Sequence, residues 1–315
     1  MPLEIFGIAF IAVAVLLVSA VPGYIFIKSK MMSEEAISAF TKLLLYVASS
    51  CLVIFAFKSA TFSVEKLIDL GIFALLSLLL NGIMLGGAFL VLKKRYKDTV
   101  YRIITIATTF TNCTFFGIPI IEALLPEQAS EIIIYASVYA LVMNIFGWTV
   151  ASAIISGDAR YISLKKILIN PTMICTVIAF LLFLTQLPIH PEFENLISIT
   201  GKMSTPLSMI IMGMRLATMK FSSLFVNPRV YITVAVKQIV MPLATFALVY
   251  FLPVNPEIKA VLFIVAACPV ASAVLNYSEL VGEGQKEAAN MVLLGTILSL
   301  ITLPITMMLL PFLGV

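Results

Sequence analysis

Long apolar stretches, separated by short polar segments, run along most of the 315 residues. About 20 apolar residues are enough to cross a bilayer as a helix. No polar segment between the stretches is long enough to form a separate soluble core. The sequence therefore predicts one all-α polytopic membrane domain over residues 1–315. Its ten candidate spans lie at about 4–27, 36–57, 68–92, 101–125, 131–155, 170–187, 196–219, 229–251, 258–278 and 287–312.

Composition strengthens this interpretation and adds an orientation. The chain is 61% hydrophobic and 11% charged, whereas soluble domains are about 25% charged. Most of its 20 lysines and arginines lie in the loops that follow odd-numbered spans. Because basic loops stay in the cytoplasm, we expect a multi-pass protein of the plasma or inner cell membrane. Its 5–6 loop would be cytoplasmic, and both termini would lie outside.

Two of the spans are interrupted. The fourth contains Thr-Asn-Cys-Thr-Phe-Phe-Gly-Ile-Pro at 111–119, and the ninth contains Cys-Pro-Val-Ala-Ser-Ala at 268–273. Lipid offers no hydrogen bonds, so backbone freed by glycine and proline must face protein or a wet cavity. Paired broken helices in two halves of a chain are the best sequence indication of a transporter's binding site.

The polar segment at 156–166 divides the spans five and five. An odd number of spans per half makes the second half enter the membrane from the opposite side, which is an inverted repeat. A weak echo supports this, because Thr41-Lys42 and Gly201-Lys202 open the second and seventh spans. We therefore predict repeats at about 1–155 and 167–315. In the third span, Gly82 and Gly86 are one turn apart and predict close helix packing inside the bundle.

The interruption in the fourth span has the chemistry of an anion site. The side-chain amide of Asn112 offers two donors and one acceptor. Pro119 frees the carbonyl of Phe115, four residues earlier. A helix that starts within the membrane presents amide donors to a carboxylate, and one that ends there presents carbonyls to a cation. The alternative is a structural kink in which Asn112 bonds a neighbouring helix. In the ninth span, Pro269 plays the same part and Asn276 is a further polar candidate.

Charged side chains inside the spans are few. Lys237 in the eighth span either balances an anionic substrate or extends to the membrane surface, and surface extension is favoured for Arg215. The four cysteines have no metal-site spacing. We find no nucleophilic triad, zinc helix, phosphate-binding loop or haem signature. The sequence therefore does not indicate an enzyme, a cofactor or a metal, and its basic residues do not indicate a nucleic-acid partner.

Together, residues 112–119, 268–277 and 300–304 resemble the auxin efflux carrier (PIN-like) family, and the short 5–6 loop resembles its prokaryotic members. The resemblance implies a five-plus-five fold like that of bile-acid symporters and sodium–proton antiporters, with helices 4 and 9 crossing. It also implies an elevator-type movement, a homodimer, and transport of small organic anions such as malate, malonate or auxin-like carboxylates. Thr111 and Cys113 depart from the plant pattern, which has Pro and Thr there. The candidate substrate-binding residues are Thr111, Asn112, Cys113, Thr114, Gly117, Pro119, Lys237, Pro269, Val270, Ala271 and Asn276.

Three functions stay open at this point. The first is a secondary carrier of small organic anions, coupled to protons or sodium, with Asn112 bonding the carboxylate. The second is a sodium-coupled symporter of the bile-acid type, which needs a cluster of oxygen ligands. The third is a channel or receptor without coupling. The candidate sodium ligands are Thr111, Asn112, Thr114, Ser272 and Asn276.

Overall fold

The computed structural model describes residues 2–158, 160, 171–219 and 227–315. Within these ranges the backbone is helical apart from short connections. The β-type contact that they contain is an isolated bridge between Thr111 and Val270. The expected all-α fold is confirmed for this part of the chain. Most of the 5–6 loop, and residues 220–226 of the 7–8 loop, lie outside the described residues.

Six segments of the described chain are long and apolar enough to cross a membrane, which makes the protein a multi-pass membrane protein. They are Pro2–Lys28, Ala36–Lys58, Val64–Arg95, Ala129–Ser156, Pro228–Tyr250 and Gln285–Met307. Their α-helices are α1 (Pro2–Val18), α2 (Val21–Lys28), α3 (Ala36–Leu43), α4 (Ser49–Lys58), α5 (Val64–Leu92), α8 (Ala129–Phe146), α9 (Ser152–Ser156), α14 (Pro228–Ala235), α15 (Met241–Tyr250) and α18 (Gln285–Met307).

The other four expected spans are built from shorter helices. The fourth is divided into α6 (Thr99–Ala107) and α7 (Gly117–Leu124), and the ninth into α16 (Pro256–Ala267) and α17 (Ala273–Val281). The seventh consists of α12 (Pro191–Lys202) and α13 (Ser204–Thr218), and the sixth is α11 (Pro171–Thr185). The total of ten spans and the inverted repeat stay predictions.

Local sequence explains where several of these helices begin. The side chain of Asp98 accepts a hydrogen bond from the amide of Val100 at the start of α6. Asn227 and Asn255 do the same at the starts of α14 and α16, where a proline follows directly. A short polar acceptor followed by proline is a strong helix start, because it bonds an exposed amide and fixes the first φ angle.

Three spans contain a π-helical turn, at η1 (Leu44–Ala48), η3 (Gly147–Ala151) and η6 (Val236–Val240). A π-turn inserts one extra residue into a helix and is frequent at functional sites. At η1, the hydroxyl of Ser49 donates to the carbonyl of Leu44 at 2.8 Å, which supports the widened turn. All three turns lie in long apolar segments, and Pro242 follows η6 at the start of α15.

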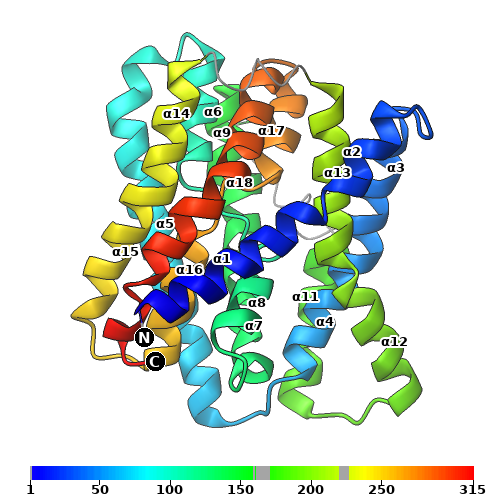
Figure 1. Ribbon diagram of the computed structural model, residues 1–315. Helices are drawn as coiled ribbons and strands as arrows, with labels where there is room; N and C mark the ends of the chain where they lie inside the picture. The colour runs from blue at the N-terminus through cyan, green and yellow to red at the C-terminus, as the bar shows by residue number, and fades with distance from the viewer. Residues whose placement is uncertain (1, 159, 161–170, 220–226) are drawn as a thin grey trace.

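Packing divides the helices into two groups, which Figure 1 shows side by side. In the first group α2 packs on α13, and α4 packs on α11 and α12. The second group, called here the crossing group, consists of α5 to α9 and α14 to α18. The α1 helix runs obliquely from the crossing group, where it packs on α18, towards α2 in the first group. Both chain ends lie at the same lower end of the molecule in Figure 1.

Glycines bring the backbones of α2 and α13 together in the first group. A Cβ atom on Gly23 would lie 1.9 Å from the carbonyl oxygen of Ile210, and one on Gly213 would lie 1.8 Å from that of Ala20. In contrast, a Cβ on Gly82 or Gly86 of α5 would meet nothing within 4 Å. The prediction that these two glycines pack closely inside the bundle is therefore wrong.

Candidate functional site

The two interrupted spans meet at their breaks. Figure 1 shows α6 and α17 in the upper half of the molecule and α7 and α16 in the lower half. The amide of Asn112 donates to the carbonyl of Pro269 at 2.9 Å, and the amide of Ala271 donates to that of Phe110 at 3.0 Å. The segments between the half-helices therefore pair as a short antiparallel bridge. Each segment gives the other the backbone hydrogen bonds that lipid cannot provide.

Thr111 completes the helix end that Pro269 disturbs. Because proline has no N–H, the carbonyl of Val265, four residues earlier, loses its usual helical partner. The Thr111 hydroxyl lies 2.6 Å from that carbonyl and 3.3 Å from the carbonyl of Cys268. This contact joins the fourth-span break to the end of α16, with Thr111 itself only 3% exposed.

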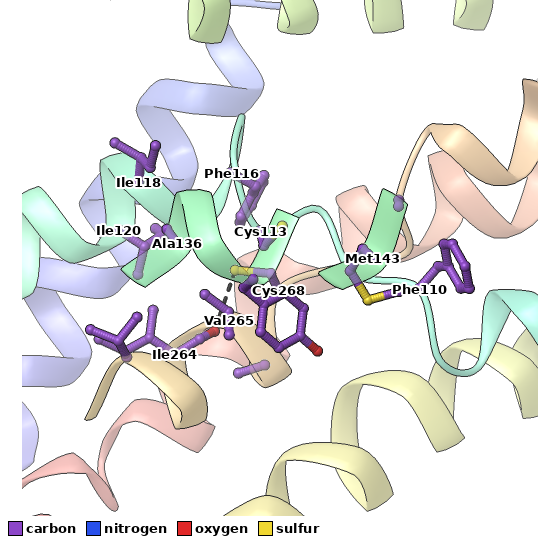
Figure 2. Packing of buried hydrophobic residues seen from close by; sticks show 14 of the residues in the cluster. Phe110, Cys113, Phe116, Ile118, Ile120, Ala136, Met143, Ile264, Val265 and Cys268 are labelled. Carbon is purple, nitrogen blue, oxygen red and sulfur yellow. Dashed lines mark hydrogen bonds between the residues drawn. The ribbon is translucent and has the colours of Figure 1, made fainter. Parts of the chain in front are cut away.

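The two buried thiols at the crossing take part in packing. Figure 2 shows Cys113 and Cys268 among apolar side chains such as Phe116 and Val265, and the Sγ of Cys268 donates to the carbonyl of Ile264 at 3.3 Å. A Cβ on Gly117 would lie 3.5 Å from this Sγ, which is an ordinary contact. Among the described residues, no group of three or more His, Cys, Asp or Glu side chains could hold a metal.

A cavity of about 590 Å³ opens beside the crossing. This volume is in the range of small-molecule sites. The described residues of its lining carry no formal charge and come from five regions of the chain. These are Leu45, Tyr46, Ser49 and Val53; Phe110 to Phe115; Ala140, Met143, Asn144 and Trp148; Thr172; and Ala271, Ser272, Ala273, Asn276 and Tyr277.

Aromatic rings form one wall of the cavity. The ring of Tyr277 meets Phe110 edge-on with centroids 5.7 Å apart, and Trp148 with centroids 6.0 Å apart. Gly147 makes room for this arrangement, because a Cβ there would lie 1.7 Å from the Tyr277 hydroxyl oxygen. The wall is therefore held by close packing at the start of η3.

Asn112 lines this cavity and has a buried, unused donor. It is 4% exposed, and among the described residues its Nδ2 has no hydrogen-bond partner. A buried donor without a partner costs about 1–3 kcal/mol. The Nδ2 donor therefore matches a ligand with an acceptor oxygen. The alternative, a structural kink in which Asn112 bonds a neighbouring helix, would need a bond from Nδ2, and the described residues form none.

Helix starts add a positive potential to the same region. Ala271, Ser272 and Ala273, at the beginning of α17, all line the cavity, and α7 begins at Gly117, two residues after the lining residue Phe115. The first amides of a helix carry partial positive charge. The cavity thus has an amide donor and two helix starts beside it, which is an arrangement suited to a carboxylate.

The structure brings together only part of the predicted site. The cavity is lined by Thr111, Asn112, Cys113, Thr114, Ala271 and Asn276. Gly117, Pro119, Pro269 and Val270 belong to the crossing without lining the cavity, and the ammonium of Lys237 donates to the carbonyl of Ala266 at 2.8 Å. Sequence analysis missed the wall of Phe110, Trp148 and Tyr277, for which the chain's single tryptophan was the available signal. Arg215 pairs with Glu279 at 3.3 Å, and its expected extension to the membrane surface stays a prediction.

Comparison with known proteins identifies the family. No curated protein matches the chain significantly. A sequence profile described as "membrane transport protein" matches residues 8–165 and 158–307, which together cover almost the whole chain. With its apolar helices and the crossing at their centre, the chain belongs to the membrane transport protein family, which includes the auxin efflux carriers.

Proposed function

We propose that this membrane transporter is a secondary active carrier of small organic anions, such as malate, malonate or auxin-like carboxylates. The observation that carries the proposal is the unpartnered Nδ2 of Asn112 beside a 590 Å³ cavity. A substrate carboxylate would accept a hydrogen bond from this amide, and the starts of α7 and α17 would stabilise its charge. The aromatic wall would contact the apolar part of the substrate.

The absence of charged side chains from the cavity lining has a consequence for turnover. A lysine or arginine in direct contact would hold a carboxylate tightly, whereas an amide and helix starts bind it with partial charges. A carrier must release its substrate on the far side in every cycle. An uncharged lining therefore suits exchange between the two sides better than retention.

The two helix groups support an elevator-type movement in this proposal. The crossing group would carry its side of the cavity, with Asn112 and Ala271, across the membrane. The group that contains α2 and α13 would stay fixed. The close backbone contacts at Gly23 and Gly213 support a fixed first group, because they hold α2 tightly against α13. In the first half of the chain, the oblique α1 and residues 59–63 before α5 link the two groups, and α4 also packs on α8.

Orientation and assembly complete the proposal. Both termini lie at one end of the molecule (Figure 1), as an even number of crossings requires. The basic loops would place that end outside the cell membrane. The homodimer follows from the family resemblance, with the first helix group as its expected contact.

Uptake into proteoliposomes tests the proposal. Labelled malate, malonate and indole-3-acetate would be supplied with and without imposed pH and sodium gradients. We expect saturable uptake of at least one anion, which Asn112→Ala reduces by at least about tenfold because the amide donor proposed to bind the carboxylate is lost. The gradient that drives uptake would name the coupling ion, and sodium would favour the symporter alternative.

A matched control separates binding from folding. Ser137 is also buried with an unpartnered side-chain oxygen, but it does not line the cavity. Ser137→Ala should therefore leave uptake unchanged. Wild-type uptake by Asn112→Ala would refute the site, and a conductance far above carrier turnover would favour a channel.

A further inference from the structure

Lys237 is a charged side chain buried in the centre of the crossing group. Its exposed fraction is 0%, and its Nζ donates to the carbonyl oxygen of Ala266 at 2.8 Å. None of the ion pairs formed by the described residues includes it. An ammonium at this depth is costly unless specific groups compensate its charge. The compensating group here is the end of a helix.

Ala266 is the second-last residue of α16, where backbone carbonyls have no amide partner in the helix. These carbonyls form the negative end of the helix dipole. Thr111 and the amide of Cys268 reach the carbonyl of Val265, and Lys237 reaches that of Ala266. Donors from this chain therefore occupy the place where a broken helix would otherwise attract a cation.

The π-turn η6 directs Lys237 into this position. Lys237 and its neighbour Gln238 are both buried, at 0% and 1% exposed, although consecutive residues of a regular helix point about 100° apart. Gln238 donates to the carbonyl of Gly295 at 2.5 Å and accepts from Thr302 at 3.0 Å. These two bonds fix η6 against α18, so that the lysine faces α16 from a rigid support.

The corresponding helix end in the other broken span, the end of α6, has uncharged hydrogen-bond donors. At the end of α6, the hydroxyls of Thr108 and Thr109 donate to the carbonyl of Thr105 at 3.0 and 3.4 Å. Neutral donors are sufficient there. The end of α16 thus has a full positive charge that its counterpart lacks.

We propose that Lys237 is a positioning residue that acts as the resident cation of the crossing, holding the carbonyl end of α16 in place of a bound metal ion. The protein then assembles its crossing without sodium or potassium. Removal of the ammonium leaves a helix end with partial negative charge that a small cation from solution can occupy. This inference concerns the crossing and holds whichever substrate the cavity takes.

Thermal unfolding of the full-length protein in detergent tests the inference without relying on transport. Wild type, Lys237→Met and Lys237→Arg are compared in choline, sodium, potassium and methylammonium chloride at equal ionic strength. Methionine retains the length of the side chain without its charge, and arginine retains a charge. Lys42→Met is the control, since Lys42 is exposed.

We expect the wild-type melting temperature to be the same in all four salts. Lys237→Met should melt at least ~5 °C lower in choline, because a buried helix end has lost its charged partner. Sodium, potassium or methylammonium should restore part of that loss by binding the folded state. Lys237→Arg and Lys42→Met should not respond to the cation.

Four results would overturn the proposal. They are sodium or potassium stabilisation of the wild type, wild-type stability of Lys237→Met in choline, a destabilised Lys237→Met that no cation restores, and failure of both Lys237→Met and Lys237→Arg to fold. The last would assign the lysine a packing role. Folding of Lys237→Arg where Lys237→Met fails in every salt would support the need for the charge. Because the readout is stability, none of these results depends on whether malate, malonate or indole-3-acetate is transported.

Discussion

The hydroxyl of Thr111 lies 2.6 Å from the carbonyl oxygen of Val265, the group that Pro269 leaves without its usual helical partner. A defect in one broken span is thereby repaired by a side chain from the other. The proline and the threonine act together, although Pro269 belongs to the ninth span and Thr111 to the fourth. Site and scaffold meet at this contact, since Thr111 also lines the cavity.

Thr111→Val should therefore destabilise the protein. The substitution retains the shape of the side chain and removes the donor, which leaves the carbonyl of Val265 with the 3.3 Å bond from the amide of Cys268 alone. The loss of one buried hydrogen bond costs about 0.5–1.5 kcal/mol. Thermal unfolding in detergent measures the loss, and Thr111→Ser should recover most of it. Thr185, whose hydroxyl bonds within its own helix at an exposed site, provides the control Thr185→Val. A Thr111→Val protein as stable as wild type would contradict the repair.

Asn112→Asp should abolish uptake while the protein stays folded. The change replaces a donor by a carboxylate at the place where the proposed substrate carries its own negative charge, and like charges at close range repel. Uptake in proteoliposomes should fall at least about tenfold, the loss expected on removal of one hydrogen-bond donor. If Asn112→Asp transports an organic anion as fast as wild type, the substrate carboxylate does not bind here.

Gly213→Ala should disrupt the first helix group. The added Cβ would lie 1.8 Å from the carbonyl oxygen of Ala20, and a backbone atom cannot rotate away as a flexible side chain can. Overpacking of this kind costs about 1–3 kcal/mol or more. Gly82→Ala is the control, because it adds the same atom to a transmembrane helix in open space. Equal melting temperatures for the two variants would show that α2 and α13 separate easily.

Arg215 and Glu279 connect the two helix groups, since the first lies on α13 and the second on α17. The pair is partly exposed, so its contribution to stability is under about 1 kcal/mol. In an elevator-type carrier, however, a bond between the moving and fixed parts must break in every cycle. We expect Arg215→Ala to change the uptake rate with little change in melting temperature. The exchanged pair Arg215→Glu with Glu279→Arg should restore the rate, and no effect of either change would exclude the ion pair from the cycle.

The breaks at the crossing were predictable because asparagine, glycine and proline are incompatible with an uninterrupted membrane helix. The family resemblance implied that helices 4 and 9 cross, and the backbone bonds from Asn112 to Pro269 and from Ala271 to Phe110 join the two breaks. The partner of Lys237 was not predictable, because a lysine in a membrane helix can bond several kinds of group. Only the packing of η6 against α16 places the carbonyl of Ala266 within its reach. The same holds for Tyr277, whose place in the cavity depends on Gly147 in a distant span.

Other misses have a different physical origin. The three π-turns share no sequence pattern, since η1 is almost wholly aliphatic, η3 contains Gly147 and Trp148, and η6 contains Lys237. Gly82 and Gly86 have the spacing that allows two helices to pack closely, but the spacing does not indicate whether a partner helix lies beside it. The close contact between α2 and α13 shows no such glycine spacing in the sequence. Gly23 and Gly213 lie on separate helices, and each is a single glycine.

The antiparallel bridge between the two breaks also sets an order of events during synthesis. Thr111 and Val265 are 154 residues apart, so the fourth span enters the membrane long before its partner exists. At about 5–20 residues per second, the wait is roughly 8–30 s. Throughout that interval, the backbone groups around Asn112 need water, lipid headgroups or the insertion machinery as temporary partners. The first half of this protein therefore completes its own fold only after the ribosome has nearly finished the second.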